Sequence, residues 1–498
     1  MKVQGSEMEN PFRRTGDFLK QQWPFPVLVS GDSRLMALLA MGGKRISNSG
    51  RAGRFVGVSL AAALLAYWGH QSALNLSQVY ILFLALWAIG LWLTEAIPPF
   101  AVGILIIGFL VFSQGALGAE GEQIRKYVDT WSSPVIWLLL GGFFLAEGMR
   151  KTGLDQALFH FTFRLAGDNP RRLLGGLMLT TGLASMVMSN TSTAAMMLAS
   201  VLPMIKARGA EDPLSKALLL GIPAAASLGG MGTIIGSAPN AVAVGALQAQ
   251  GIAVDFLDWM AYGIPPAMAL LALFYFFLLR AYRLPRVWTN PPLPSRESET
   301  PAPIGERRTV LLVTALTIAL WISTPWHGIP VAVISGLPIV LLTLTSVLYA
   351  NDVRRLPWDT LMLVAGGLAL GLALVDSGLA ALLLSQLQLD IPLPLLILVF
   401  GLVTVLLSNI MSNTATASIL VPLGLMLLGG QSEETGIMAV LIALAASCAL
   451  FLPVSTPPNA IAFSTGLLQQ KDFYRGGLLA ALLGPSLSLL WLLLLQSF

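Results

Sequence analysis

The sequence predicts an all-α integral membrane protein with about eleven transmembrane helices and two re-entrant hairpins in an inverted repeat. Composition is the first observation: 55% of the 498 residues are hydrophobic and 11% are charged, whereas about a quarter of an average soluble protein is charged. So few charged side chains cannot cover a soluble globule of this length. Long apolar stretches and a set of motifs that occurs twice in the same order are the second and third observations.

The cysteine and histidine content excludes several kinds of site. The single cysteine, Cys448, cannot form an intrachain disulfide. The three histidines, His70, His160 and His327, stand far apart in the sequence, which argues against a zinc centre. The net charge of +4 is explained by basic loops between the apolar stretches, so we predict no nucleic-acid partner.

The apolar stretches set the order of the elements. Residues 1–54 are polar and basic and are predicted to form a cytosolic N-terminal tail, followed by a first transmembrane helix and loop at 55–77. A first repeat is predicted at 78–282 and a second at 309–498, separated by a cytosolic linker at 283–308 that is rich in Pro, Ser and Glu. The stretches long enough to enter or cross a bilayer lie near 55–70, 78–96, 99–115, 133–149, 172–205, 214–247, 262–282, 309–325, 329–349, 358–380, 391–428, 434–466 and 476–497.

Two of these stretches, 172–205 and 391–428, are interrupted by polar residues in the middle. Each is too long for one spanning helix and a short fit for two, so we predict that each is a re-entrant hairpin. With a cytoplasmic N-terminus, eleven spans then place 27 of the 29 Lys and Arg residues inside and leave only Arg125 and Lys126 outside. This asymmetry follows the positive-inside rule. It predicts a multi-pass protein of the inner (plasma) membrane with its N-terminus cytoplasmic and its C-terminus outside.

The two halves of the chain contain matching motifs. "MSNTSTA" at 188–194 matches "MSNTATA" at 411–417 with an offset of 223 residues, and "GSAPNAVA" at 236–243 matches "STPPNAIA" at 455–462 with an offset of 219. A glycine-rich stretch matches at an offset of 225, where Gly141, Gly142 and Gly153 correspond to Gly366, Gly367 and Gly378. Five spans and a hairpin per copy make the second copy enter the membrane from the opposite side. Inverted repeats of this kind are typical of secondary transporters.

Polar residues at membrane depth concentrate in these motifs, and such residues are usually functional. The Ser-Asn-Thr triplets at 189–191 and 412–414 lie in the middle of the predicted hairpins, where Ser or Asn can cap a helix whose N-terminus attracts an anion. The segments 229–240 and 452–459 contain Gly and Pro, which break helices and expose backbone carbonyls suited to a hard cation such as sodium. A lone Ser or Thr often only bonds the carbonyl one turn back, but the paired occurrence favours a functional role.

These paired motifs resemble those of the divalent anion:sodium symporter family, and the resemblance covers nearly all of residues 78–498. It implies a homodimer that moves a divalent anion and sodium, with about two sodium sites, by an elevator-type mechanism in which the substrate-binding part moves against a scaffold. It implies sodium ligands at Ser185, Ser189, Asn190 and Gly232 in the first copy, and at Ser408, Ser412, Asn413 and Ala449 in the second. It implies substrate contacts at Asn190, Thr191, Asn413, Thr414, Ser237, Thr456 and Pro457. The first copy departs from the family pattern, because it has Ser237-Ala238 where the second has Thr456-Pro457.

The predicted function is sodium-coupled symport of divalent anions across the lipid bilayer, chiefly C4-dicarboxylates such as succinate, malate and fumarate. The site motifs contain no Lys or Arg, so hydrogen bonds, helix N-termini and co-bound sodium must balance the charge of the anion. The alternatives are a sodium-independent dicarboxylate exchanger, a sodium-coupled citrate or sulfate transporter, and a passive channel. No enzyme is predicted: Glu147 and Asp376 are interpreted as structural partners near span ends, and no nucleophile–base pair lies at membrane depth.

Overall fold

The computed structural model describes residues 48–71, 74–166, 169–209, 211–286, 303–379, 382, 391–428 and 433–496. The chain forms two compact units, Met1–Arg54 and Phe55–Phe498, and the helices discussed here belong to the second, apart from the first residues of α3 (Asn48–Gln71). Most of the predicted tail at 1–54 and of the predicted linker at 283–308 lies outside the described residues. Every regular element in the described part of the chain is helical, which confirms the all-α prediction.

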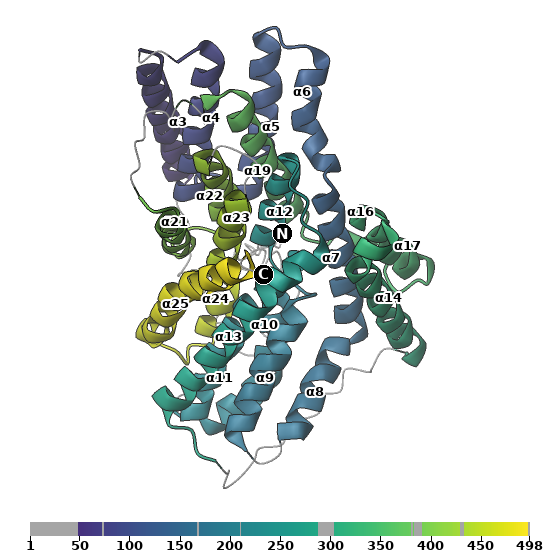
Figure 1. Cartoon of the computed structure of the whole chain (residues 1–498). Helices are drawn as coiled ribbons and strands as arrows, with labels where there is room; N and C mark the ends of the chain where they lie inside the picture. The colour runs from purple at the N-terminus through teal and green to yellow at the C-terminus, as the bar shows by residue number, and fades with distance from the viewer. Residues whose placement is uncertain are drawn as a thin grey trace, which may run out of the picture. The chain divides into compact units, whose positions relative to one another are not determined.

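The helices follow one another along the chain as labelled in Figure 1. In the first half, α3 is followed by α4 (Leu76–Thr94), α5 (Pro99–Ala116), α6 (Gly121–Val128), η2 (Asp129–Ser132), α7 (Pro134–Thr152), α8 (Leu154–Ala166), α9 (Pro170–Ser185), α10 (Asn190–Arg208), α11 (Pro213–Gly229), η3 (Gly230–Gly232), η4 (Ile234–Gly236), α12 (Ala238–Ala249) and α13 (Phe256–Tyr282). The second half contains α14 (Ile304–Ile322), α15 (Thr324–His327), α16 (Val331–Ile334), α17 (Gly336–Leu344), α18 (Ala350–Val353), α19 (Trp358–Asp376), α21 (Leu393–Ser408), α22 (Asn413–Leu428), α23 (Glu433–Ala446), α24 (Pro457–Ser464) and α25 (Gln470–Gln496).

Eight helical stretches in the described residues are long and apolar enough to cross a membrane: α3, α4, α5, the stretch from α6 to α7, α11, α13, α19 and α25. The other three predicted spans are shorter, interrupted or charged at one end. α14 carries the charged residues Glu306, Arg307 and Arg308 near its start. The stretch at 329–349 contains the short helices α16 and α17, and the stretch at 434–466 is divided between α23 and α24. The membrane class is confirmed, and the number of eleven crossings stays a prediction.

Two short helices, α6 and α8, occur where the sequence predicted loops. α6 carries Arg125 and Lys126, and Lys126 Nζ lies 2.5 Å from Asp376 Oδ2 at the end of α19. This ion pair fits the interpretation of Asp376 as a structural partner. α8 follows directly on α7 after Gly153 and packs on α9. Each of the two helices is by itself too short to cross a bilayer, although α6 continues through η2 into the spanning stretch that ends with α7.

The helices recur in the order that the repeated motifs predict. α9 and α21 each have 16 residues, α7 and α19 each have 19, and α13 and α25 each have 27. The matched Gly153 and Gly378, which follow α7 and α19, have φ angles of 63° and 66°. Glycine adopts this left-handed conformation without strain. The two copies therefore share helix lengths as well as motifs.

Close backbone contact explains one of the repeated glycines. A Cβ atom built on Gly366 of α19 would lie 2.2 Å from the Cα atom of Gly103 on α5. Small residues allow membrane helices to approach in this way. The α5–α19 crossing therefore depends on glycine at both positions.

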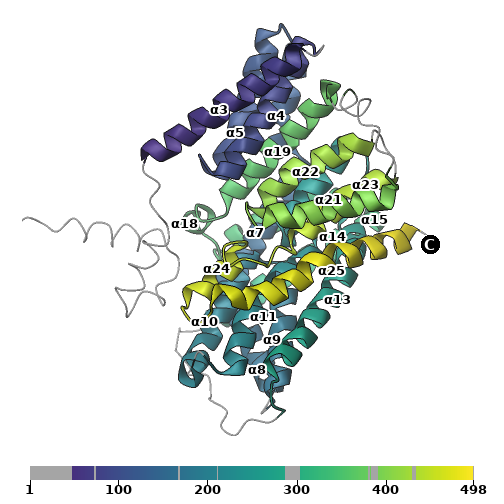
Figure 2. The ribbon, with the colours of Figure 1, turned by 90° about the vertical axis from the view of Figure 1, so that its left-hand side faces the viewer.

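Each copy contains a broken helix, and the helix that follows the break packs against the other copy. α12, which continues the break after α11, packs on α22 and α23 of the second copy, and α24 packs on α10 and α11 of the first. The helices α21, α22, α23 and α25 lie side by side in both views (Figures 1 and 2). Each hairpin therefore packs against the broken helix of the other copy, which brings the elements that carry the repeated motifs into contact.

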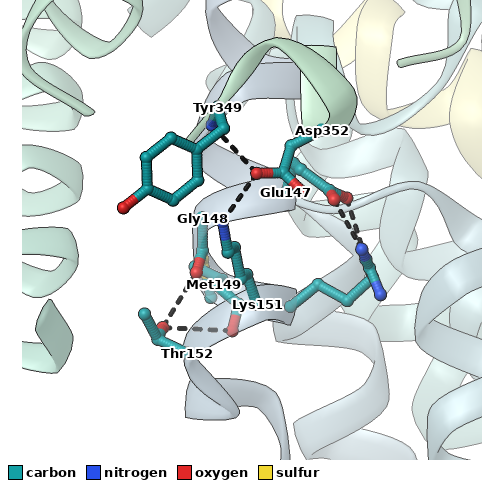
Figure 3. A network of polar contacts seen from close by, with 8 residues as sticks. Glu147, Gly148, Met149, Lys151, Thr152, Tyr349 and Asp352 are labelled. Carbon is teal, nitrogen blue, oxygen red and sulfur yellow. Dashed lines mark hydrogen bonds and ion pairs between the residues drawn. The ribbon is translucent and has the colours of Figure 1, made fainter. Parts of the chain in front are cut away.

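A polar network joins the end of α7 to α18 (Figure 3). Lys151 Nζ donates to Asp352 Oδ2 at 2.6 Å and lies 4.4 Å from the ring centroid of Tyr349. Asp352 Oδ2 also accepts the backbone N–H of Tyr349 at 2.9 Å. On α7 itself, Glu147 pairs with Arg150 at 2.5 Å, which fits the interpretation of Glu147 as a structural partner.

Candidate functional site

The first hairpin turns between α9 and α10 at its Ser-Asn-Thr motif. Ser189 is the N-cap of α10: its Oγ accepts the N–H of Ser192 at 3.2 Å and lies 2.9 Å from Ser192 Oγ. Ser189 and Thr191 are both exposed. The triplet therefore starts a helix, as a serine at this position favours.

Ser185 and Asn190 face the broken helix α11. Ser185 Oγ donates to the carbonyl oxygen of Ala226 at 2.8 Å and lies 2.6 Å from the Asn190 amide. The Asn190 amide nitrogen, oriented by its acceptors, lies 3.1 Å from the carbonyl oxygens of both Ala226 and Gly236. A Cβ atom on Gly230 would lie 2.5 Å from this amide, so glycine is needed there. In the first copy, the hairpin tip and the helix break share one cluster of oxygen atoms.

Asn240 holds the first helix break together. Its Nδ2 donates to the carbonyl oxygens of Gly230 at 2.8 Å and of Thr233 at 2.7 Å. Thr233 Oγ1 donates to the carbonyl oxygen of Met186 in the hairpin tip and accepts the N–H of Gly236 at 3.0 Å. The sequence predicted that the backbone carbonyl groups of segment 229–240 face a cation. Two of these carbonyl groups, those of Gly230 and Thr233, instead accept hydrogen bonds from Asn240.

Asn459 and Asn409 have the corresponding roles in the second copy. Asn459 Nδ2 donates to two carbonyl oxygens of the break after α23, at 3.3 and 3.2 Å. Asn409 lies in the tip of the second hairpin, and its Oδ1 accepts the N–H of Phe451 at 3.0 Å and the hydroxyl of Ser455 at 2.7 Å. Its Nδ2 donates back to its own helix, to the carbonyl oxygen of Val405 at 2.8 Å. A single side chain thus fixes the second hairpin to the second break.

Both copies contain buried oxygen atoms that have no hydrogen-bond partner within the described residues. In the second copy these are Ser408 Oγ, Asn413 Oδ1 and Ser447 Oγ, and in the first copy they include Ser227 Oγ of α11 and Asn240 Oδ1. The first-copy counterparts of Ser408 and Asn413, which are Ser185 and Asn190, instead bond each other and α11. A buried oxygen without a partner costs about 1–3 kcal/mol. These atoms are therefore suited to a ligand that brings positive charge.

Four helices begin at the repeated motifs, and each has a serine or threonine at its N-cap. The four residues are Ser189 before α10, Ser237 before α12, Ser412 before α22 and Thr456 before α24. Thr456 Oγ1 accepts the N–H of Asn459 at 3.3 Å, and Ser412 Oγ accepts the N–H of Ala415 at 3.2 Å. A helix N-terminus carries about half a positive charge. α10 packs on α24 and α12 on α22, and a helix N-terminus can bind an anion without Lys or Arg.

The predicted site residues divide into a buried and an accessible group. The buried residues are Ser185, Gly232, Ser237, Ser408, Ala449 and Thr456. The exposed or half-exposed residues are Ser189, Asn190, Thr191, Ser412, Asn413, Thr414 and Pro457. Ser185 and Asn190 are in direct contact. The accessible group contains both complete triplets, as expected of positions that a substrate reaches.

The sequence analysis assigned no site role to four residues that shape the site. Ala226 and Gly236 contribute backbone carbonyl oxygens; Gly236 lies within the segment 229–240 that was predicted to expose carbonyls, whereas Ala226 lies outside it. The repeated Pro-Asn pair is the signal that could have identified Asn240. Asn409 has no polar counterpart in the first copy, where Met186 occupies the matching position, so the repeat gave no signal for it.

The citrate transporter family (CitMHS) model matches residues 84–445, well over half of the chain. The chain belongs to the citrate transporter family. This family member is 31% identical over 482 residues to the sodium-dependent dicarboxylate transporter SdcS of Staphylococcus saprophyticus, covering 89% of this chain and 92% of that protein. It is 30% identical over 464 residues to SdcS of Staphylococcus aureus strain USA300, covering 84% and 87%. Among solved structures, the Alcanivorax borkumensis YdaH transporter aligns with 80% of this chain and 97% of that chain, at a TM-score of 0.46 and 15% identity.

Family membership establishes the class of activity. The citrate transporter family member is a multi-pass membrane protein and a secondary transporter, not an enzyme. The resemblance to divalent anion:sodium symporters, inferred from the paired motifs, is confirmed.

Proposed function

We propose that this citrate transporter family member is a sodium-coupled symporter of divalent anions, with C4-dicarboxylates such as succinate, malate and fumarate as substrates. The observation that carries the proposal is the set of buried oxygen atoms Ser408 Oγ, Asn413 Oδ1 and Ser447 Oγ, which lack partners within the described residues. Hard cations bind neutral oxygen ligands, and broken helices of transporters bind sodium. A bound sodium ion would interact with these three oxygen atoms, which have no hydrogen-bond partner among the described residues.

Two sodium sites are proposed, one in each copy. The first comprises Ser185, Ser189, Asn190 and Gly232, and the second comprises Ser408, Ser412, Asn413 and Ala449. The carbonyl oxygens of Ala226 and Gly236, each 3.1 Å from the Asn190 amide, support the first site. The unpartnered oxygens support the second.

The anion is proposed to bind between the exposed triplets and the helix ends that pack against them. Its contacts are proposed to be Asn190, Thr191, Ser237, Asn413, Thr414, Thr456 and Pro457. Hydroxyl groups and helix N-termini can hold a carboxylate, and nearby sodium would offset its charge. The names of the SdcS relatives, sodium-dependent dicarboxylate transporters, support this choice of substrate.

The transport mechanism is proposed to be elevator-type alternating access in a homodimer. α9, α21 and α22 each have 16 residues. A helix of this length extends about 24 Å, less than the roughly 30 Å of a hydrocarbon core. This length supports hairpins that enter and leave on the same side, in an inner-membrane protein with a cytoplasmic N-terminus and an external C-terminus.

Ligand-dependent stability of the purified protein tests the proposal. We expect succinate, malate and fumarate to raise the melting temperature in sodium and not in choline. A ligand at a hundred times its Kd stabilises by about 2.7 kcal/mol. Equal stabilisation in choline would favour the sodium-independent exchanger, and a response to citrate or sulfate alone would contradict the C4-dicarboxylate assignment.

A further inference from the structure

A groove whose lining contains none of the proposed transport-site residues lies between α8, α9 and α13. Its volume is about 780 Å3, and its described lining is apolar apart from two arginines at one end, two threonines and Tyr275. The threonines do not need a ligand, because Thr162 Oγ1 and Thr180 Oγ1 bond each other at 2.5 Å. The groove is therefore an apolar channel with a charged end.

The charged end lies at the start of α9. Arg171 is held in place, because its Nε and Nη2 donate to the carbonyl oxygen of Leu284 at 2.8 and 2.6 Å. Arg172 is exposed. No acidic residue lines the groove in the described part of the chain. Arg172 is thus available to an anionic group.

The apolar part follows α9 toward the hairpin tip. Arg172 and Leu183 both line the groove and are eleven positions apart in the sequence, or about 17 Å along a helix. This length is close to half of the roughly 30 Å hydrocarbon core, which is one leaflet. Leu179 and Leu183, which both line the groove, are 41% and 50% exposed. The groove matches the length and polarity of one lipid in one leaflet.

Two glycines keep the walls of the groove close to α9. A Cβ atom on Gly175 would lie 3.1 Å from the Tyr275 ring of α13, and a Cβ atom on Gly176 would lie 2.8 Å from Thr162 Cγ2 of α8. Tyr275 also donates its hydroxyl to the carbonyl oxygen of Arg171 at 3.2 Å. The groove is therefore a built feature, whose sides are fixed by contacts to the backbone of α9.

We propose that this groove binds an anionic glycerophospholipid, with the phosphate group at Arg172 and an acyl chain along α9. Basic pockets between transmembrane helices bind anionic headgroups, and apolar walls favour an acyl chain over a polar dicarboxylate. The proposal does not rest on sodium coupling or on the identity of the transported anion. It adds a lipid site on the side of α9 that faces α8 and α13.

Native mass spectrometry of the purified full chain, with phosphatidylglycerol and phosphatidylcholine added in equal amounts, tests this site. We expect the wild type to retain phosphatidylglycerol preferentially. Arg172→Gln should weaken phosphatidylglycerol binding about fivefold, since one basic residue near the surface contributes about that much. Leu179→Trp should weaken retention of both lipids by narrowing the groove beside α9.

Matched substitutions outside the groove serve as controls. Arg308→Gln removes an exposed arginine of α14, and Leu316→Trp enlarges a 48% exposed leucine of the same helix. Both should retain the lipid as the wild type does. Equal retention of the two lipids by the wild type, or equal effects of Arg172→Gln and Arg308→Gln, would overturn the proposal. Displacement of the lipid by succinate would do so too, because it would assign the groove to the transported anion.

Discussion

Ser185 and Ser408 hold matched positions in the two hairpins but have different partners. Ser185 Oγ donates to the Ala226 carbonyl oxygen at 2.8 Å, whereas Ser408 Oγ is buried without a partner among the described residues. A hydrogen bond contributes about 1 kcal/mol, while a buried hydroxyl without one is destabilising. The same substitution should therefore have unequal effects at the two positions.

We expect Ser185→Ala to lower the thermal stability of the sodium-free protein by the equivalent of about 1 kcal/mol, and Ser408→Ala to leave it unchanged or raise it. Both variants should gain less stability from sodium, because each loses a proposed sodium ligand. Melting temperatures measured over a sodium titration report both effects. Ser200→Ala, which removes the hydroxyl that donates to the Met196 carbonyl oxygen outside the motifs, is the control. A wild-type sodium response in Ser408→Ala would remove Ser408 from the site.

At the scale of single residues, the sequence predicted where helices begin better than it predicted which residues bond to one another. The triplets identified the helix starts at Asn190 and Asn413, because Ser is a good N-cap and the motif occurs twice. The contacts of Asn240 and Asn409 could not be predicted, because they join segments whose approach depends on tertiary packing. Their role is to satisfy backbone groups that a broken helix leaves without partners.

At the scale of elements, the length of the apolar stretches predicted the long helices. The short helices were not predicted, because their sequences are polar. α6 and α8 have 8 and 13 residues and carry charges, so no spanning stretch revealed them. The joint between α7 and α8 was visible only as Gly153, one of the repeated glycines. Arg307 Nε donates to the carbonyl oxygen of Thr152 at 2.9 Å at this joint, a contact across 155 residues that no local pattern predicts.

The pair of Lys151 with Asp352 should stabilise the attachment of α7 to α18. Burial raises the pKa of Asp352, but the hydrogen bonds from Lys151 and from the Tyr349 N–H outweigh it and hold the pKa below the usual 3.8. We expect Lys151→Gln to cost about 1–2 kcal/mol of thermal stability at neutral pH. An acid with a lowered pKa stabilises the fold above its unfolded pKa and loses this effect as the pH falls. The gap to the wild type should therefore be constant from pH 8 to 5 and close below 3.8.

A second lysine pair is the control for this prediction. Lys216 bonds Glu211 at 2.8 Å, but the Glu211 side chain is 88% exposed. Exposed pairs contribute little, so Lys216→Gln should leave the melting temperature unchanged. Equal losses in the two variants would show that the Lys151 pair has no special structural role.

At the scale of the whole molecule, the repeat in the sequence predicted the recurrence of helices but not their interlocking. The motif offsets indicated matched hairpins and breaks, and α9 and α21 begin and end at the offset of 223 residues. The crossing of α12 onto α22 and of α24 onto α10 is a property of packing. Only the three-dimensional structure shows that the hairpin of each copy packs against the broken helix of the other copy.

Membrane orientation can be tested with two introduced cysteines. Ala253, between α12 and α13, and Gly305, at the start of α14, are both exposed, and the buried Cys448 makes the wild type a suitable background. We expect an impermeant maleimide to label Ala253→Cys in intact cells and Gly305→Cys only after permeabilisation. Labelling of Gly305→Cys in intact cells would contradict the proposed topology.

Uptake of labelled succinate into proteoliposomes tests sodium coupling most directly. With an inward sodium gradient, we predict that internal succinate rises above the external concentration and returns to it as the gradient dissipates. With choline in place of sodium, uptake should be near the level of protein-free vesicles. Succinate entry at the same rate in choline, or entry that never exceeds the external concentration, would contradict sodium-coupled symport.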